Sequence, residues 1–240
     1  MKKNKIKNNN KKHLIIIIIL SVLLLISLIF NIISYINKDD CSDIDNNQNG
    51  LPYTVKKPIL YIYPKKNKTK VTVSFENPNL LTTTYPKYNK KWVVTANKNG
   101  DLTDKNGNYY YGLYWEEERN LNIDFSQGYY VTKENAISFL EDKLKYIGFN
   151  DKERNEFIIY WLPVLEKNKK SIVHFELTEE RNEYNKINIS PKPDSMLRVS
   201  MHVKKVDSEP HNLERQHMKH FNRKGFTVVE WGGVIHDEKE

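Results

Sequence analysis

Cysteine is almost absent from this chain of 240 residues. The single Cys41 excludes an intramolecular disulfide framework, because a disulfide needs two thiols. A CxxC pair, the signature of zinc ribbons and thiol oxidoreductases, is excluded for the same reason. Two roles stay open for Cys41: self-association through a disulfide to a second copy of the chain, or an unpaired thiol.

Signature motifs of catalysis are also missing. The sequence has no HExxH metalloprotease motif, no nucleophile elbow and no phosphate-binding loop. An enzyme built from this chain would need carboxylates, or histidines brought together from distant strands. The sequence therefore leaves catalysis open and favours a protein that is not an enzyme, and it indicates no particular cofactor or metal.

Acidic residues are missing from the first 38 positions, and this explains the charge of the whole chain. The formal charge is +8, but residues 1–38 hold seven of the 38 basic residues and no acid. The remainder has 31 basic against 30 acidic side chains. Because that part has no global basic bias to attract phosphate backbones, we expect no nucleic-acid partner.

Residues 14–36 contain no charged side chain. A helix of this length would span roughly 34 Å, enough to cross a hydrocarbon core of about 30 Å. Lysines crowd the preceding segment, whereas Asp39 and Asp40 follow it and suit no signal-peptidase site. This charge asymmetry predicts an uncleaved, single-pass transmembrane anchor that contacts membrane lipid. Its N-terminus would be cytoplasmic, and the C-terminal domain would be extracytoplasmic, attached to the cell membrane.

The chain divides by composition into five segments. We predict a basic cytoplasmic tail over 1–13 and the transmembrane signal anchor over 14–36. Residues 37–56 are polar and predict a flexible stalk. The folded exported domain is expected over 57–233, and a charged tail over 234–240.

Within the exported domain the pattern is mostly that of β-strands. Asn99-Gly100 and Asn106-Gly107 supply tight-turn residues, so residues 92–115 predict a three-stranded meander. Candidate strands are rich in aromatic and β-branched residues: 59–63, 70–76, 92–97, 109–115, 129–131, 171–177, 186–189, 196–203 and 226–231.

Two amphipathic segments interrupt the strands. The first predicts a helix over 133–147 that stops at Gly148, with a buried stripe that includes Ile137 and Leu144. The second begins after Asn150, with Glu153 as its capping-box partner. The expected fold class is therefore α+β: an N-terminal transmembrane helix, then a mainly antiparallel β domain, sheet or sandwich, with the helix pair packed on it.

Four segments resemble those of a family of bacterial exported, membrane-anchored proteins for which no activity is established. The segments are KPILYIYP (57–64), NEFIIYWLP (155–163), SPKPDSMLRV (190–199) and GFTVVEWGG (225–233). The resemblance spans most of residues 57–233 and implies one exported domain. That family has a glycine after the first Trp-Glu pair, where this chain has Glu117.

One candidate ligand-binding patch comes from two strands. Period-two alternation puts His174 and Glu176 on the face of their strand opposite the core, and Arg198 and His202 on the corresponding face of theirs. If the two strands are neighbours, these side chains converge and could hold a divalent metal or an anionic ligand. The alternative is an ordinary solvated sheet face.

Further candidates lie where an aromatic residue adjoins an acid. Trp115 precedes Glu116, and Trp231 follows Glu230, so each pair could contribute to a sugar or peptide site. The carboxylates could also serve as acid and base in glycan hydrolysis. The alternatives are a solvated acidic turn and plain core tryptophans. Glu230 shares a face with apolar neighbours, so its charge needs a partner if that face is buried.

Taken together, these features favour a membrane-anchored extracytoplasmic binding or structural module of the bacterial cell envelope. Cell-wall glycan and another envelope protein are its candidate partners. One alternative is a carboxylate- or metal-dependent cell-wall hydrolase, and another is an accessory subunit of a membrane complex.

Overall fold

The computed structural model describes residues 21, 24–27 and 52–236. The chain divides into two units, Met1–Asn49 and Gly50–Glu240, and all strands of the described residues belong to the second unit. That unit is mainly β, with its strands arranged in two sheets.

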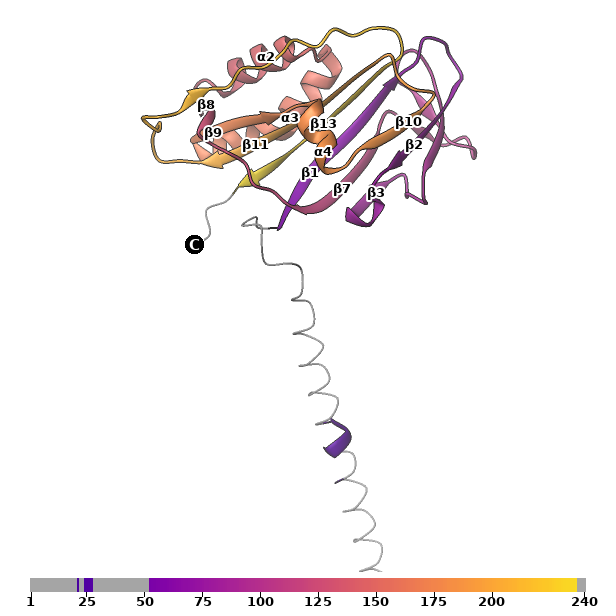
Figure 1. Cartoon of the computed structure of the whole chain (residues 1–240), viewed down its shortest axis with the longest axis horizontal. Helices are drawn as coiled ribbons and strands as arrows, with labels where there is room; N and C mark the ends of the chain where they lie inside the picture. Colours follow the sequence, from indigo (N-terminus) through magenta and orange to yellow (C-terminus); the bar gives the residue numbers. More distant parts are fainter. Residues whose placement is uncertain (1–20, 22–23, 28–51, 237–240) are drawn as a thin grey trace, which may run out of the picture. The chain divides into compact units, whose positions relative to one another are not determined.

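Eight strands form a mixed sheet in the order β12-β8-β9-β11-β13-β1-β7-β3 (Figure 1). Neighbours pair antiparallel, except that β11 pairs in parallel with β13 and β8 in parallel with β12. The strands are β12 (Glu214–Arg215), β8 (Gln127–Thr132), β9 (Lys170–Glu176), β11 (Ser195–Lys205), β13 (Thr227–His236), β1 (Pro52–Tyr63), β7 (Leu113–Asn120) and β3 (Leu81–Tyr85).

A second, antiparallel sheet has five strands in the order β10-β2-β4-β5-β6. They are β10 (Ile187–Ser190), β2 (Thr69–Phe75), β4 (Trp92–Ala96), β5 (Leu102–Thr103) and β6 (Tyr109–Tyr110). A 3-10 helix, η1 (Pro78–Leu80), precedes β3.

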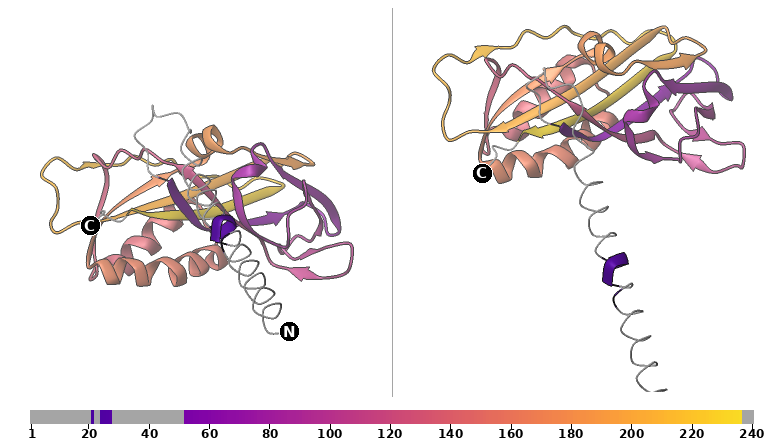
Figure 2. Two further views of the ribbon diagram at one scale, coloured as in Figure 1. Left: turned by 90° about the horizontal axis from the view of Figure 1, so that it is seen from below. Right: turned by 60° about the horizontal axis from the view of Figure 1, so that its bottom comes forward.

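Both faces of the eight-stranded sheet are covered. The helices α2 (Ala136–Ile147) and α3 (Asp151–Asn168) lie on one side, which we call the helix face (Figure 2). The short α4 (Thr178–Tyr184) lies on the other side, the α4 face. The five-stranded sheet shares a second hydrophobic core with the α4 face.

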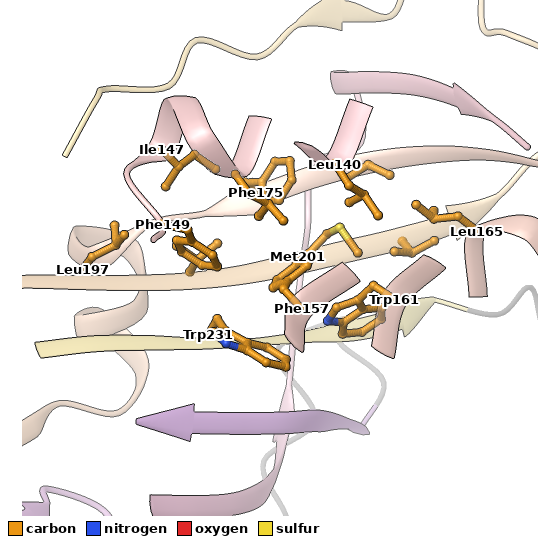
Figure 3. Close-up of a cluster of buried hydrophobic side chains, with 14 of the residues drawn as sticks. Leu140, Ile147, Phe149, Phe157, Trp161, Leu165, Phe175, Leu197, Met201 and Trp231 are labelled. Atoms are coloured by element: carbon orange, nitrogen blue, oxygen red, sulfur yellow. The ribbon is translucent and has the colours of Figure 1, made fainter. Parts of the chain in front are cut away.

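Period-two alternation explains the core on the helix face. Phe175 of β9, Met201 of β11 and Trp231 of β13 point to the same side and meet the helices (Figure 3). Leu140 of α2 and Trp161 of α3 complete this cluster, and all five side chains are buried. Burial of each large apolar side chain contributes about 1.5–3 kcal/mol, so this layer anchors the helix pair.

Local signals determine where the two long helices begin and end. Asn150 and Glu153 form the predicted capping box, with reciprocal backbone-to-side-chain bonds of 2.9 Å. Gly148 ends α2 in the left-handed region at φ 112°. Pro163 lies inside α3, which continues beyond it to Asn168. Ile137 is 50% exposed rather than buried.

The expected fold class needs correction in its membrane component. Among the described residues, no helix is long and apolar enough to cross a membrane. The longest, α3, carries charged side chains along its length, including Asp151 and Glu166. The predicted span 14–36 lies outside the described residues apart from 21 and 24–27. The domain itself is mainly β, with two sheets, and most neighbouring strands are antiparallel; the two parallel pairs make the larger sheet mixed.

The domain is also longer at both ends than the composition indicates. β1 begins at Pro52, inside the predicted stalk, and Val55 is buried against Leu121 and Val234. β13 continues to His236, inside the predicted tail. Both segments belong to strands, because the start of β1 pairs with β7 and the end of β13 pairs with β11.

The predicted meander is present as β4, β5 and β6, with Gly100 and Gly107 at positive φ in its turns. The expected strand over 109–115 is divided, however. It leaves the five-stranded sheet after Tyr110 and enters the eight-stranded sheet at Leu113. The chain therefore crosses between the two sheets at Tyr111 and Gly112.

Candidate functional site

The two histidine strands are neighbours, as the patch hypothesis required. In the β9–β11 ladder, His202 lies opposite His174 and Ser200 lies opposite Glu176. The rings of His174 and His202 are 6.5 Å apart between centroids. His202 Nε2 lies 3.0 Å from a Glu176 carboxylate oxygen.

The patch is nevertheless not a solvated sheet face. His202 is 0% exposed, and Glu176 and Arg198 are buried as well. The other nitrogen of His202, Nδ1, lies 2.9 Å from His236 Nε2, so both ring nitrogens face protein partners. The part of the chain that the structure describes contains no group of three side chains placed to hold a metal ion. The geometry is that of an internal hydrogen-bond relay.

Arg198 and Glu230 belong to a second buried polar network, centred on α4. Glu230 accepts from Arg198 at 2.7 Å and from Arg181 at 3.2 Å, so its charge has partners. Arg181 also lies 3.7 Å from Glu117. Burial alone would raise the pKa of Glu230, but the two guanidinium groups outweigh it and hold that pKa below its ordinary value. Glu230 and Glu117 are 0% and 1% exposed, and carboxylates without solvent access are unsuitable for acid–base catalysis.

Both predicted tryptophan contacts are wrong. Trp115 is fully buried in the core between the sheets, where its ring packs 5.0 Å from that of Phe75. Trp231 is fully buried under α3, and its Nε1 donates to the Tyr61 hydroxyl at 3.2 Å. Neither ring reaches a surface where a ligand could stack.

A different pocket, lined by tyrosines, has the open geometry of a ligand site. Its volume is about 410 Å³, within the range of roughly 300–1,000 Å³ typical of small-molecule pockets. It lies where the chain crosses between the sheets, and residues from β1, β3, β6 and β7 line it: Lys57, Ile59, Tyr85, Tyr109, Tyr110, Tyr111, Gly112 and Tyr114. We call it the tyrosine pocket.

Three of these rings are largely open to solvent: Tyr85 is 63% exposed, Tyr109 59% and Tyr111 43%. Exposed large side chains gathered in one place mark a binding surface more often than scattered ones do. Successive side chains of a strand point to opposite faces, so a strand cannot bury all three consecutive tyrosines at 109–111 on one side. This run of tyrosines was a sequence signal for an exposed aromatic surface, and our strand assignment missed it.

The tyrosine rings are held in place by neighbouring side chains. The hydroxyl of Tyr109 donates to Asp101 at 2.8 Å, and that of Tyr110 donates to Asp104 at 3.2 Å. The rings of Tyr85 and Tyr110 pack edge to face at 5.6 Å. Because these contacts order the rings before a ligand arrives, binding would cost less side-chain entropy.

The floor of the pocket contains a β-bulge in β1. Lys56 pairs with Gly233 and Ile59 pairs with Trp231, so Lys57 and Pro58 together face a single β13 residue. Pro58 has no N–H to donate to the ladder, which confines it to a bulge or an edge. The bulge holds Lys57 at φ 49°, a left-handed conformation that is unusual for lysine.

Two carboxylates lie beside the tyrosine pocket without lining it. Burial and a hydrogen bond to Glu116 raise the pKa of Tyr114 to about 12. Glu156 of α3 accepts from the Tyr61 hydroxyl at 2.5 Å. Glu116 is thus the predicted site residue that the fold does place next to an open pocket.

Comparison with known proteins gives limited help. A protein of Butyrivibrio fibrisolvens described as "Uncharacterized protein in bglA 3'region" is 40% identical over 62 residues, which cover 25% of this chain. The match spans 64% of that relative's length. No family model matches the chain, and no solved structure matches it. The family resemblance of the four sequence segments therefore stays a prediction.

Proposed function

We propose that this protein is a binding module that holds a saccharide in the tyrosine pocket. The observation that carries the proposal is the set of five tyrosines around one pocket, three of them largely exposed and two anchored by aspartates. The cell-envelope location and the glycan partner predicted from the sequence remain predictions that fit it.

A sugar ring is chemically complementary to the tyrosine side chains that line the pocket. A hexose has an apolar C–H face and a polar rim, and a tyrosine has an apolar ring with a polar hydroxyl. The exposed rings of Tyr85, Tyr109 and Tyr111 can cover a C–H face. The hydroxyls of Tyr109 and Tyr110 already donate to aspartates, so their remaining lone pairs can accept from sugar hydroxyls.

Glycan hydrolysis is the second candidate, but the carboxylates first considered for it do not favour it. Glu117 and Glu230 are buried beside Arg181, away from solvent. Glu116 and Glu156 lie closer to the pocket, yet they accept hydrogen bonds from Tyr114 and Tyr61 and do not line the pocket. A binding role accounts for the tyrosine pocket and assigns no reaction to these four carboxylates.

Titration of the full-length protein with soluble chitotetraose and with peptidoglycan disaccharides, followed calorimetrically, tests the proposal. We expect Tyr85→Ala and Tyr111→Ala each to weaken binding about tenfold, which corresponds to ~1.4 kcal/mol. Tyr146→Ala is the matched control, because Tyr146 is also exposed but lies on α2, outside the pocket. Binding that survives both pocket variants would refute the site, and shortening of the oligosaccharide would favour the hydrolase.

A further inference from the structure

Lys57 is the one charged side chain among the residues that line the tyrosine pocket. It is half-buried, and within the described residues its ammonium group forms no ion pair. A lysine can lay its aliphatic stem along apolar rings and keep its charged head at the open side of a pocket. An unpaired ammonium group in a pocket therefore suggests that a ligand supplies the counter-charge.

Aromatic rings position this ammonium group without neutralising it. Lys57 Nζ lies 4.9 Å from the centroid of the Tyr160 ring and 5.9 Å from that of the Trp231 ring. Each such contact attracts the cation through the ring quadrupole, but the net charge is unchanged. The cation is thus held in place and still available to an anion.

The backbone conformation at Lys57 also determines where its side chain lies. Lysine at φ 49° is strained, and such strain persists only where the surroundings impose it. The bulge is held closely against β13 here, since a Cβ on Gly232 would lie 3.1 Å from the Pro58 Cα. The bulge also changes which side chains of β1 point to each face of the sheet. Val55 packs on the α4 face, whereas Ile59, four residues later, packs on the helix face.

The neighbouring carboxylates do not satisfy Lys57. Glu116 accepts from Tyr114, and Glu156 accepts from Tyr61. Neither of them lines the pocket, so an incoming anion would meet the ammonium group and the tyrosines first.

We infer that Lys57 makes the tyrosine pocket selective for a saccharide that carries a carboxylate group. The carboxylate pairs with the ammonium group at the bulge while the sugar ring rests on the tyrosines. This inference rests on the proposed saccharide-binding function and adds the charge class of the ligand.

Two disaccharides of the same linkage provide a matched test. One is N-acetylglucosamine joined to N-acetylmuramic acid, which carries a lactyl carboxylate; the other is chitobiose, which lacks it. We expect the full-length protein to bind the acidic disaccharide about tenfold more tightly. Lys57→Gln should remove that difference between the two disaccharides.

Two further variants separate charge from shape. Lys57→Arg keeps the charge and should keep most of the preference, and Lys152→Gln should leave it intact. Lys152 is an exposed lysine whose Nζ lies 5.0 Å from the Tyr111 ring, outside the lining of the pocket. The melting temperature of each variant, measured in parallel, shows whether the fold is retained.

The outcomes distinguish the two proposals. Equal affinity for both disaccharides, or a preference unaffected by Lys57→Gln, would overturn the charge selectivity and leave the saccharide pocket in place. An equal loss with Lys57→Arg and Lys57→Gln would also overturn it, because the charge would then not be the cause. Failure of the wild-type protein to bind either disaccharide would overturn both.

Discussion

Trp161 of α3 packs directly against the backbone of Gly233 in β13. A Cβ placed on Gly233 would lie 2.4 Å from the Trp161 ring and 2.3 Å from the Met201 carbonyl oxygen. Distances below 3.0 Å are essentially never adopted by real Cβ atoms, so only glycine fits here. This contact seats α3 on the sheet immediately beside the bulge that carries Lys57.

Gly233→Ala should therefore lower the free energy of unfolding by about 1–3 kcal/mol, the usual cost of overpacking a core. Gly232→Ala is the internal comparison and should cost less, because its nearest contact would be 3.1 Å from Pro58. Chemical denaturation measures both. Equal stability of Gly233→Ala and wild type would show that Trp161 does not press on β13.

In the buried ion network, removal of the charge of Glu230 should strongly destabilise the fold. Glu230→Gln leaves Arg198 and Arg181 without their main acidic partner, and we expect a loss of ~3–5 kcal/mol in unfolding free energy. Glu118→Gln is the control, because Glu118 is exposed on β7 and should change stability by less than ~0.5 kcal/mol. Similar midpoints for the two variants would refute the network.

His236 predicts a pH dependence of stability. Burial and the adjacent His202 lower the pKa of His236 to about 3, against an ordinary value of 6.5 in the unfolded chain. The unfolded chain therefore binds this proton more readily, so stability is full above pH ~6.5 and falls as the pH drops toward ~3. His236→Gln should reduce this slope between pH 7 and pH 5, measured by urea denaturation. The exposed His211→Gln should leave the slope as in wild type.

The helix pair can be tested with two positions on α2. Leu144→Ala should destabilise the domain by about 2–5 kcal/mol, because the side chain is fully buried in the helix-face core. Ile137→Ala removes a similar side chain from a half-exposed position on the same helix and should cost much less. If both variants have equal denaturation midpoints, α2 is not packed as described.

Local chemistry in the sequence determined much of the secondary structure. The capping box at Asn150 and Glu153, the helix stop at Gly148 and the Asn-Gly turns of the meander depend on residues a few positions apart. The same holds for the division of β9 and β11 into an apolar and a polar face, since side chains alternate with a period of two. His174 and His202 were placed on one face correctly for this reason.

Only the tertiary structure decided what covers each face and where an open pocket remains. Periodicity separates two sides of a strand but carries no information about a second sheet or about α4. It therefore could not show that Glu176, Arg198 and His202, three of the four patch residues, are buried. The tyrosine pocket depends on residues from four strands, and Lys57 lies in a bulge that packs against Gly232, far away in the sequence. Such long-range packing cannot be deduced from local pattern, because each side chain's environment is supplied by segments that pair only when the chain folds.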